Sequence, residues 1–180
     1  MSRIRITGGE WRSRMVQVPN VPSAPGLRPT PDRVRETLFN WLGQDLGGLG
    51  CLDLFAGSGI LGFEAASRGA EYVALVERSR PAFMALKKHA DGFDCPRLEL
   101  FCCDALKFAP ASGRRFDLLF LDPPYGQGWL ARIEPRLDQL AAKGARLYAE
   151  AEMPLQQLGR WSVVKQGQAG QVFFHLLEQA

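Results

Sequence analysis

A glycine-rich segment near residue 57 has the spacing of a nucleotide-binding loop. Gly57, Gly59 and Gly62 fit the pattern G-x-G-x-x-G directly after an apolar stretch that is predicted to be a strand. Such a loop lets a ligand approach the backbone closely and places it near a helix N-terminus. Glu77 ends the next predicted strand, where a carboxylate would accept hydrogen bonds from ribose hydroxyls. This pattern alone does not separate a nicotinamide cofactor from S-adenosylmethionine.

The carboxylate of Asp53 distinguishes the two cofactors. Asp53 lies inside the predicted strand, four residues before Gly57. A carboxylate buried in a strand needs a polar or charged partner. The ammonium group of an amino acid would supply that partner, whereas a pyrophosphate would be repelled. The position of Asp53 therefore favours a cofactor with a methionine moiety.

A second segment whose residues could take part in catalysis follows the strongly apolar residues 116–121. It consists of Asp122, Pro123, Pro124 and Tyr125. The end of such a strand in an open α/β sheet faces the ligand crevice. Asp122 offers a carboxylate acceptor, Pro123 leaves a carbonyl acceptor on a stiff turn, and Tyr125 offers a flat ring. Two acceptors beside an aromatic ring suit the exocyclic amino group of a stacked nucleobase. A proline-rich turn with a capping aspartate is the structural alternative.

Positive charge is concentrated in the first fifth of the chain. Residues 1–36 contain seven arginines against three acidic residues, whereas residues 37–180 have a net charge of −1. The arginine guanidinium binds phosphates through two hydrogen bonds at once and also stacks on bases, so the pattern predicts contacts with a polyanion. A solvated face with helix ion pairs, such as Asp32–Arg35, is the alternative. The arginines expected to contact RNA are Arg3, Arg5, Arg12, Arg14 and Arg28.

The order of predicted elements indicates an α/β fold. Residues 3–6 and 14–18 should form a hairpin around a turn at Thr7-Gly8-Gly9, and residues 19–29, with four prolines, should form a loop. A helix capped by Thr30, with Pro31 at its first position, should end near Gly43. Strands are then expected at 51–55, 72–77, 97–101, 116–122 and 145–150, alternating with helices at 60–68, 79–91 and 129–143. Strands 161–166 and 172–177 should pair antiparallel.

Alternating strands and helices predict a Rossmann-like, mostly parallel sheet of seven strands with helices on both faces. The sheet should end in a C-terminal antiparallel hairpin and be preceded by an N-terminal β-hairpin extension. Residues 1–29 are expected to form an RNA-contacting extension, and residues 30–180 the main domain.

Composition excludes several classes of protein. The chain has 180 residues, 46% of them hydrophobic, and no apolar run long enough to cross a bilayer. Its N-terminus has no apolar segment typical of a secretory signal. The four cysteines form no C-x-x-C pair and there are two histidines, so neither a disulfide framework nor a metal site is expected. We therefore expect a cytoplasmic protein without a bound metal.

Two further motifs carry a family resemblance. Residues 6–12 (ITGGEWR) and 26–42 (GLRPTPDRVRETLFNWL), together with the glycine loop and the 122–125 turn, resemble the RsmD family of bacterial 16S rRNA guanine-N2 methyltransferases. The resemblance implies a class I methyltransferase that uses S-adenosylmethionine. It also implies a specific guanine of 16S rRNA as the target, in the small ribosomal subunit or a late assembly intermediate, and a monomeric enzyme.

The resemblance also implies roles for individual residues. Asp104 would contact the adenine amino group, and Asp122, Pro123, Pro124 and Tyr125 would hold the target amine. Cys102 and Cys103, just before Asp104, depart from the family pattern. The full set expected to bind the cofactor is Asp53, Phe55, Ala56, Gly57, Gly59, Glu77, Arg78, Asp104 and Ala105.

Other functions remain open from the residues alone. An amino group in a 122–125 pocket could belong to adenine N6 or to a protein glutamine. More distant alternatives are an NAD-dependent oxidoreductase, which would leave Asp53 and Asp122 without a role, and an RNA-binding module without catalysis.

Overall fold

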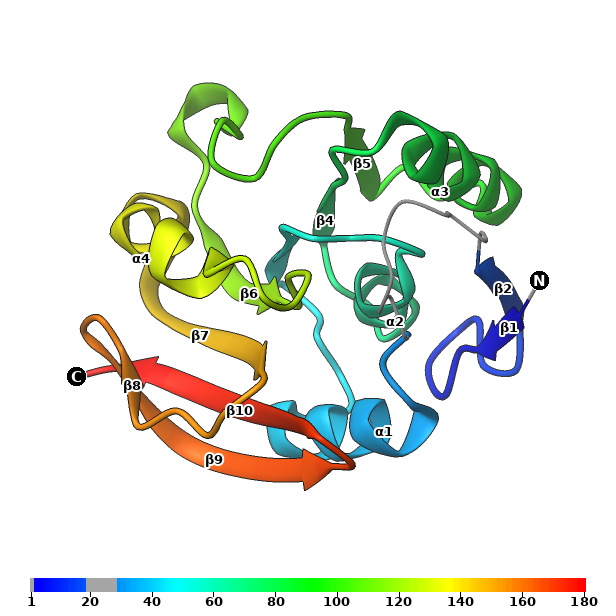
Figure 1. Cartoon of the computed structure of the whole chain (residues 1–180). Helices are drawn as coiled ribbons and strands as arrows, with labels where there is room; N and C mark the ends of the chain where they lie inside the picture. The colour runs from blue at the N-terminus through cyan, green and yellow to red at the C-terminus, as the bar shows by residue number, and fades with distance from the viewer. Residues whose placement is uncertain (1, 19–28) are drawn as a thin grey trace.

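The computed structural model describes residues 2–18 and 29–180 of the chain, and within them the fold is built on one large twisted sheet (Figure 1). Its eight strands, among these residues, run in the order β5-β4-β3-β6-β7-β10-β9-β8. The first five in this order are parallel, and β10, β9 and β8 are antiparallel to their neighbours. The strands are β3 (Gly50–Asp53), β4 (Tyr72–Val76), β5 (Leu98–Phe101), β6 (Phe116–Leu121), β7 (Ala141–Ala151), β8 (Gln157–Leu158), β9 (Trp161–Ala169) and β10 (Val172–Gln179).

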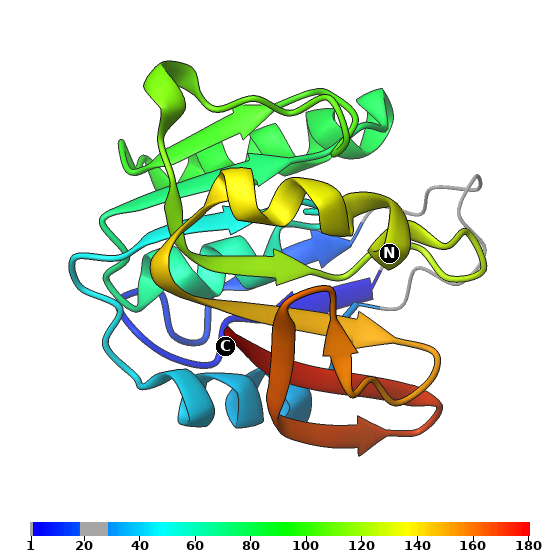
Figure 2. The same ribbon diagram turned by 90° about the vertical axis from the view of Figure 1, so that its left-hand side faces the viewer.

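Helices cover both faces of this sheet (Figure 2). They are α1 (Asp32–Leu42), α2 (Ile60–Ser67), α3 (Arg80–Phe93) and α4 (Trp129–Leu140). Side chains alternate between the faces of a strand, so Leu118 packs in the core beneath α1, α2 and α3, while Leu119 packs in the core beneath α4. The predicted α/β layering is therefore confirmed.

The N-terminal hairpin is also confirmed. β1 (Ser2–Arg5) and β2 (Met15–Val18) pair antiparallel, with Ile4 opposite Val16. Ile4, Val16 and Trp11 are buried in the same core as α1, α2 and α3. The predicted extension thus packs firmly on the main domain. Whether residues 1–29 act as a separate unit stays a prediction, and the proline-rich segment 19–28 lies outside the described residues.

Two expectations about the second half of the chain were wrong. The sheet has an eighth strand beyond the predicted seven, because buried Leu158 and Trp161 pair across a tight turn and add β8 to its edge. Helix α4 ends at Leu140 rather than at residue 143, and β7 starts at once with Ala141. A register shift in the pairing of β7 with β6 accommodates the extra residues around Gly144, the glycine that was expected to end the helix.

The predicted helix cap at Thr30 is also wrong. Pro31 occupies the N-cap position of α1 and no side chain caps the helix. The Thr30 hydroxyl instead lies 2.9 Å from Glu150 Oε1 and 3.3 Å from Asp122 Oδ2. Buried carboxylates require donors more strongly than the solvated end of a helix does. Ser79, in contrast, does cap α3, as predicted.

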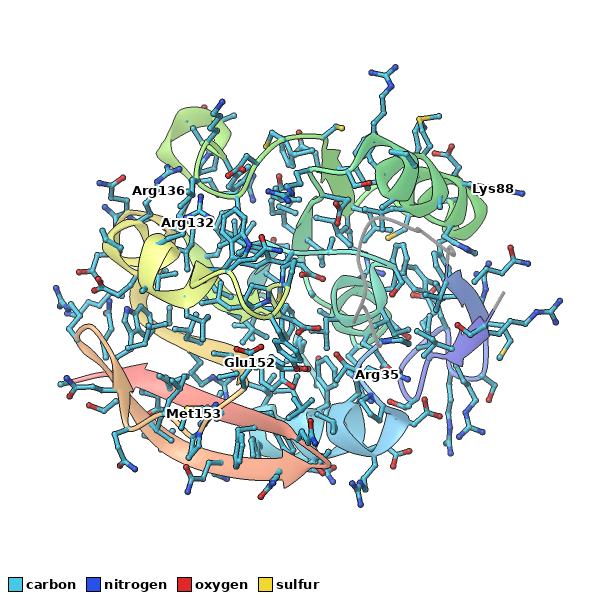
Figure 3. The ribbon with its side chains drawn as sticks, in the orientation of Figure 1. Arg35, Lys88, Arg132, Arg136, Glu152 and Met153 are labelled. Carbon is cyan, nitrogen blue, oxygen red and sulfur yellow. The ribbon has the colours of Figure 1, made fainter. Side chains whose placement is uncertain are left out.

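A buried arginine connects the hairpin, α1 and α2. The Arg35 side chain is fully buried and forms an ion pair with Glu64, which is also fully buried, at 2.5 Å. Its guanidinium also donates to the Arg5 carbonyl at 2.7 Å and the Thr30 carbonyl at 3.1 Å, and it pairs with Asp32. The Asp32–Arg35 pair suggested by the sequence therefore exists, but as part of a network around the buried Arg35 side chain rather than on a solvated face. Arg35 is labelled in Figure 3.

This network predicts a large loss of stability for Arg35→Met. Removing one partner of a buried ion pair leaves the other charge uncompensated, so the free energy of unfolding should fall by about 3 kcal/mol. Urea denaturation followed by circular dichroism measures this change. The control is Arg33→Met on the exposed side of the same helix, which should change stability by no more than about 0.5 kcal/mol. Equal effects of the two substitutions would contradict the assignment.

Candidate active site

Five carboxylates line one edge of the sheet. Asp53 ends β3, while Glu77, Asp104, Asp122 and Glu150 lie at or after the carboxyl ends of β4, β5, β6 and β7. These five strands are parallel and adjacent, so their carboxyl ends meet at one edge. In an open α/β sheet this edge is where ligands bind. The arrangement brings together four of the acidic residues predicted from the sequence and adds Glu150.

The glycine loop joins β3 to α2 as predicted. Gly59 has φ +84° and forms the N-cap of α2; a Cβ atom at this position would lie 2.3 Å from Leu86. The Gly57 N–H donates to Glu77 Oε2 at 2.9 Å, and the Ser79 N–H donates to Glu77 Oε1 at 2.7 Å. Glu77 therefore fixes the loop beside β4. Its predicted bonds to ribose stay a prediction.

Asp53 has the unsatisfied carboxylate that the sequence analysis anticipated. The residue is 1% exposed, and Oδ2 accepts a hydrogen bond from the Gly62 N–H at 3.2 Å. Oδ1 is buried and has no hydrogen-bond partner among the described residues. Burial raises the pKa of Asp53 to about 7 and the charge of Glu77 adds to this effect, whereas backbone hydrogen bonds from Gly62 and Phe55 oppose it. A buried acceptor without a donor fits a ligand that brings a cationic donor.

Asp122 belongs to a hydrogen-bonded carboxyl pair. The Thr30 hydroxyl, which is 2% exposed, lies between Asp122 and Glu150, and Tyr148 donates its hydroxyl to Glu150 at 2.8 Å. Burial raises the pKa of Asp122 well above its usual value, and the charge of Glu150 raises it further. Burial also raises the pKa of Glu150, although its bonds to Tyr148 and Thr30 oppose this. Asp122 is thus a carboxylate that readily accepts a proton.

The 122–125 turn follows β6 and carries the two predicted acceptor groups. Among the described residues no donor bonds to the Pro123 carbonyl outside regular secondary structure, so it is available beside Asp122. Pro124 is half-buried, and the Tyr125 ring is 38% exposed at the end of the turn. The turn therefore carries two acceptor groups and a partly exposed aromatic ring within four residues.

Aromatic and charged side chains contact one another next to the glycine loop. Phe55 packs edge-on against Trp129, with ring centroids 5.4 Å apart. The guanidinium of Arg78 lies 5.4 Å from the Trp129 ring and 4.0 Å from Asp104. Asp104 Oδ1 accepts from the Leu106 N–H at 2.8 Å. Of the other predicted cofactor residues, Ala56 and Ala105 are buried. Of the two cysteines that precede Asp104, Cys102 is exposed and Cys103 is half-buried.

Sequence analysis missed the inner partners of Asp122. Glu150 lies near the carboxyl end of an apolar strand, as Asp122 does, so its position at the sheet edge could have been inferred. Thr30 was assigned to a helix cap, and Tyr148 was treated as part of a strand. Their convergence depends on contacts between residues about 90 to 120 positions apart, which no local pattern reveals.

The predicted arginine surface is exposed. Arg3, Arg5, Arg12 and Arg14 all face solvent, while Arg28 lies outside the described residues. Arg5 pairs with Asp32 at 3.4 Å, and Arg14 donates to the Gly92 carbonyl at 2.9 Å. Next to them is a cavity of about 260 Å³ that sequence analysis did not anticipate. It is lined by Arg3, Arg14, Met15, Gln17, Lys88, His89, Gly92 and Phe93.

Two negative findings concern the described ranges 2–18 and 29–180. They contain no group of three or more histidine, cysteine or acidic side chains arranged to hold a metal ion. No helix in them is long and apolar enough to cross a membrane.

The chain is similar to several known proteins along almost its whole length. The family described as Conserved hypothetical protein 95 matches residues 4–178. Ribosomal RNA small subunit methyltransferase D of Escherichia coli (strain K12) is 38% identical, over 98% of this chain and 90% of that protein. The protein of the same name from Haemophilus influenzae is 37% identical, over 97% and 93% of the two chains.

Solved structures agree with these matches. A structure from Escherichia coli has a TM-score of 0.85 at 35% identity, covering 99% of this chain and 98% of the other. An RNA methyltransferase from Salinibacter ruber, in complex with S-adenosyl-L-homocysteine, has a TM-score of 0.66 at 16% identity, over 84% and 94% of the two chains; this likeness concerns the fold alone. The class I methyltransferase fold expected from the sequence is confirmed, and the chain belongs to the RsmD family.

Proposed function

We propose that the protein transfers a methyl group from S-adenosylmethionine to the exocyclic N2 of a specific guanine in 16S rRNA of the small ribosomal subunit. The relatives with 38% and 37% identity carry the name of a small-subunit rRNA methyltransferase. The substrate is the small subunit or a late assembly intermediate, and the protein acts as a monomer in the cytoplasm.

The observation that carries the proposal is the pairing of two sites across neighbouring strands. Asp53 at the end of β3 presents a buried carboxylate oxygen without a donor. Asp122, at the end of the adjacent strand β6, begins a turn with two acceptors and an exposed ring. The first site suits the ammonium of a methionine moiety, and the second suits an amino group on a flat base. The two groups would meet at one sheet edge.

Residues of the glycine loop would hold the cofactor. Asp53 would bind its ammonium group, Glu77 its ribose and Asp104 its adenine amino group. S-adenosylmethionine, when bound there, supplies a methyl group already activated by a sulfonium. The chain therefore needs no metal for activation, and its residues contribute mainly orientation.

The residues of the 122–125 turn would prepare the target amine. The N2 lone pair of guanine is delocalised into the ring, so the free amine is a poor nucleophile. Asp122 and the Pro123 carbonyl would accept its two hydrogens and direct the lone pair toward the methyl group. Positive charge develops on N2 during transfer, and these acceptors stabilise it. Tyr125 would stack on the base and compensate for its removal from the stacked RNA.

The raised pKa of Asp122 would help this carboxylate to take up a proton after methyl transfer. The methylated nitrogen is acidic and must lose a proton. Burial and the charge of Glu150 raise the pKa of Asp122, so this carboxylate can take up that proton. Thr30 and Tyr148 hold Glu150 in place, which makes all three positioning residues for Asp122.

The alternatives from the sequence have less support. An oxidoreductase that binds a pyrophosphate would place negative charge near Asp53. A binding module without catalysis would not need the Asp122–Thr30–Glu150 arrangement. Transfer to adenine N6 uses the same turn, so the reaction product must decide between the two bases.

The first prediction concerns Asp122→Ala. Loss of an acceptor that stabilises the transition state should lower methyl transfer by at least about 10²-fold, while S-adenosylmethionine affinity stays nearly unchanged. Transfer of labelled methyl groups to small-subunit particles measures the rate, and nucleoside mass spectrometry identifies the product. N2-methylguanosine is the expected product. Turnover of the variant within a few-fold of wild type would contradict the role of Asp122, and methyladenosine would contradict the proposed target.

Asp53 gives a prediction with a definite pH dependence. Its folded-state pKa of about 7 lies above the usual aspartate value, so protonation stabilises the folded protein at acid pH. This contribution is lost as the pH rises through about 7. Because the loss builds up between the ordinary aspartate pKa and about 7, Asp53→Asn should raise the unfolding temperature more at pH 8 than at pH 5. Differential scanning calorimetry at both pH values measures the shift.

The same substitution should weaken cofactor binding. Asn lacks the charge that would pair with the ammonium group, so the Kd for S-adenosylmethionine at pH 8 should rise at least about tenfold. Titration calorimetry measures the Kd, with NAD as a comparison ligand that should give no binding heat. Unchanged S-adenosylmethionine affinity, or tight NAD binding by the wild type, would refute the cofactor assignment.

The arginine surface gives a prediction about salt. If Arg12 and Arg14 contact phosphates, the double change Arg12→Ala, Arg14→Ala should weaken binding to small-subunit particles. Each phosphate contact that is removed should reduce the slope of log affinity against log salt by roughly 0.7 to 0.9. Binding is measured across a range of salt concentrations, with cofactor affinity as the folding control. An unchanged slope would show that these arginines form only a solvated face.

A further inference from the structure

A second cavity lies beside the 122–125 turn and is lined mostly by residues not assigned so far. It has a volume of about 410 Å³ and is lined by Tyr125, Glu152, Gln168, Gln171 and Phe173. Tyr125 belongs both to this cavity and to the proposed amine site. The cavity therefore adjoins the turn that is expected to hold the reacting amine.

Sheet topology explains why these residues gather. Tyr125 follows β6 and Glu152 follows β7, at the carboxyl edge of the parallel strands. β10 runs antiparallel to β7, with Phe173 opposite Ala151, so the start of β10 and the end of β9 lie at this same edge. Figure 3 shows Glu152 beside the end of β7. Burial raises the pKa of Tyr125, and the charges of Asp122, Glu150 and Glu152 raise it further because these carboxylates lie near its hydroxyl.

The lining is amphipathic in a way that suits a nucleobase. Two aromatic rings, from half-buried Phe173 and partly exposed Tyr125, offer stacking surfaces. Gln168 donates to the Gly170 carbonyl at 2.9 Å and holds the turn between β9 and β10, whereas Gln171 lies exposed at the start of β10. A carboxylate at Glu152 would repel a phosphate. The occupant that these side chains fit is therefore a base and not the RNA backbone.

Hydrogen-bonding groups distinguish guanine from adenine at this place. The Watson–Crick edge of guanine carries two neighbouring donors, the N2 amino group and N1–H, followed by the O6 acceptor. Adenine has an acceptor at N1 and an amino group at C6. A carboxylate beside the amine site can accept N1–H from guanine, but it would face an acceptor on adenine. Sites built to hydrogen-bond a donor strongly reject analogues that lack it.

We propose that this cavity is the specificity pocket for the target base, in which Glu152 accepts the guanine N1–H and the Gln171 amide donates to O6. This inference rests on the proposed guanine-N2 activity and assigns its choice of base to residues beyond the 122–125 turn. Phe173 and Tyr125 provide the stacking surfaces.

The test compares two bases that both carry the reacting amine. 2,6-Diaminopurine retains the N2 amino group but has an acceptor at N1 and an amino group in place of O6. Small-subunit particles are reconstituted with rRNA that contains guanine or 2,6-diaminopurine at the nucleotide methylated by the wild type. The wild-type enzyme should prefer guanine by at least about 10²-fold in kcat/KM. Glu152→Gln should reduce this preference at least about tenfold, because a neutral amide can accept from N1–H or donate to N1.

Controls separate specificity from folding and from the underlying activity. Glu178→Gln changes an exposed glutamate near the opposite end of β10 and should leave the preference unchanged. Gln171→Ala should also reduce the preference, while all three variants keep wild-type affinity for S-adenosylmethionine. A preference within twofold of wild type in both cavity variants would overturn the specificity pocket and leave the proposed function intact. Absence of guanine methylation by the wild type would overturn the proposed function itself.

Discussion

The buried contact between Arg35 and Glu64 determines how the N-terminal part of the chain meets the sheet. Arg35 comes from α1 and Glu64 from α2, and the pair is sealed from solvent. Because Arg35 also holds the Arg5 and Thr30 carbonyls, one side chain fixes both the hairpin and the segment that enters α1. Glu64 in turn accepts from Thr7 at the start of the hairpin loop. A buried charge needs several partners, so these elements have few alternative positions.

The hydrogen bonds of Arg35 are connected to the candidate active site through Thr30. The Arg35 guanidinium holds the Thr30 backbone, and the Thr30 hydroxyl lies between Asp122 and Glu150. Two carboxyl groups brought together in a buried site repel each other when both are ionised. The Thr30 hydroxyl lies within hydrogen-bonding distance of both carboxyl groups, and a donor at this position reduces their repulsion. We therefore propose that the N-terminal segment helps to position the candidate catalytic carboxylate, in addition to its proposed contact with RNA.

The sequence predicted most of the fold because its signals are local. Glycine turns, the Ser79 cap and apolar strands identified the parallel half of the sheet, and Asp53 and the 122–125 turn were located correctly at its edge. Where a local signal competed with a distant partner, the prediction was wrong. Thr30 has the type and position of a helix cap, but its hydroxyl bonds to Glu150, which is 120 residues away. Gly144 is of the residue type that often ends a helix, yet it lies inside β7, where a register shift in the pairing with β6 accommodates it.

The distribution of charge separates RNA attraction from chemistry. Five carboxylates at the sheet edge suit a cationic cofactor and an amine that becomes positive during transfer, but they repel the phosphates of an approaching rRNA. An enzyme with such a site needs compensating positive charge elsewhere. Arg3, Arg12 and Arg14 are exposed on or beside the hairpin, and Lys88 on α3 extends this surface at the first cavity. Long-range attraction can then act on the backbone while the acidic edge admits only the base. The small overall charge of +3 therefore conceals an uneven distribution, which suits the proposed separation of RNA attraction from chemistry.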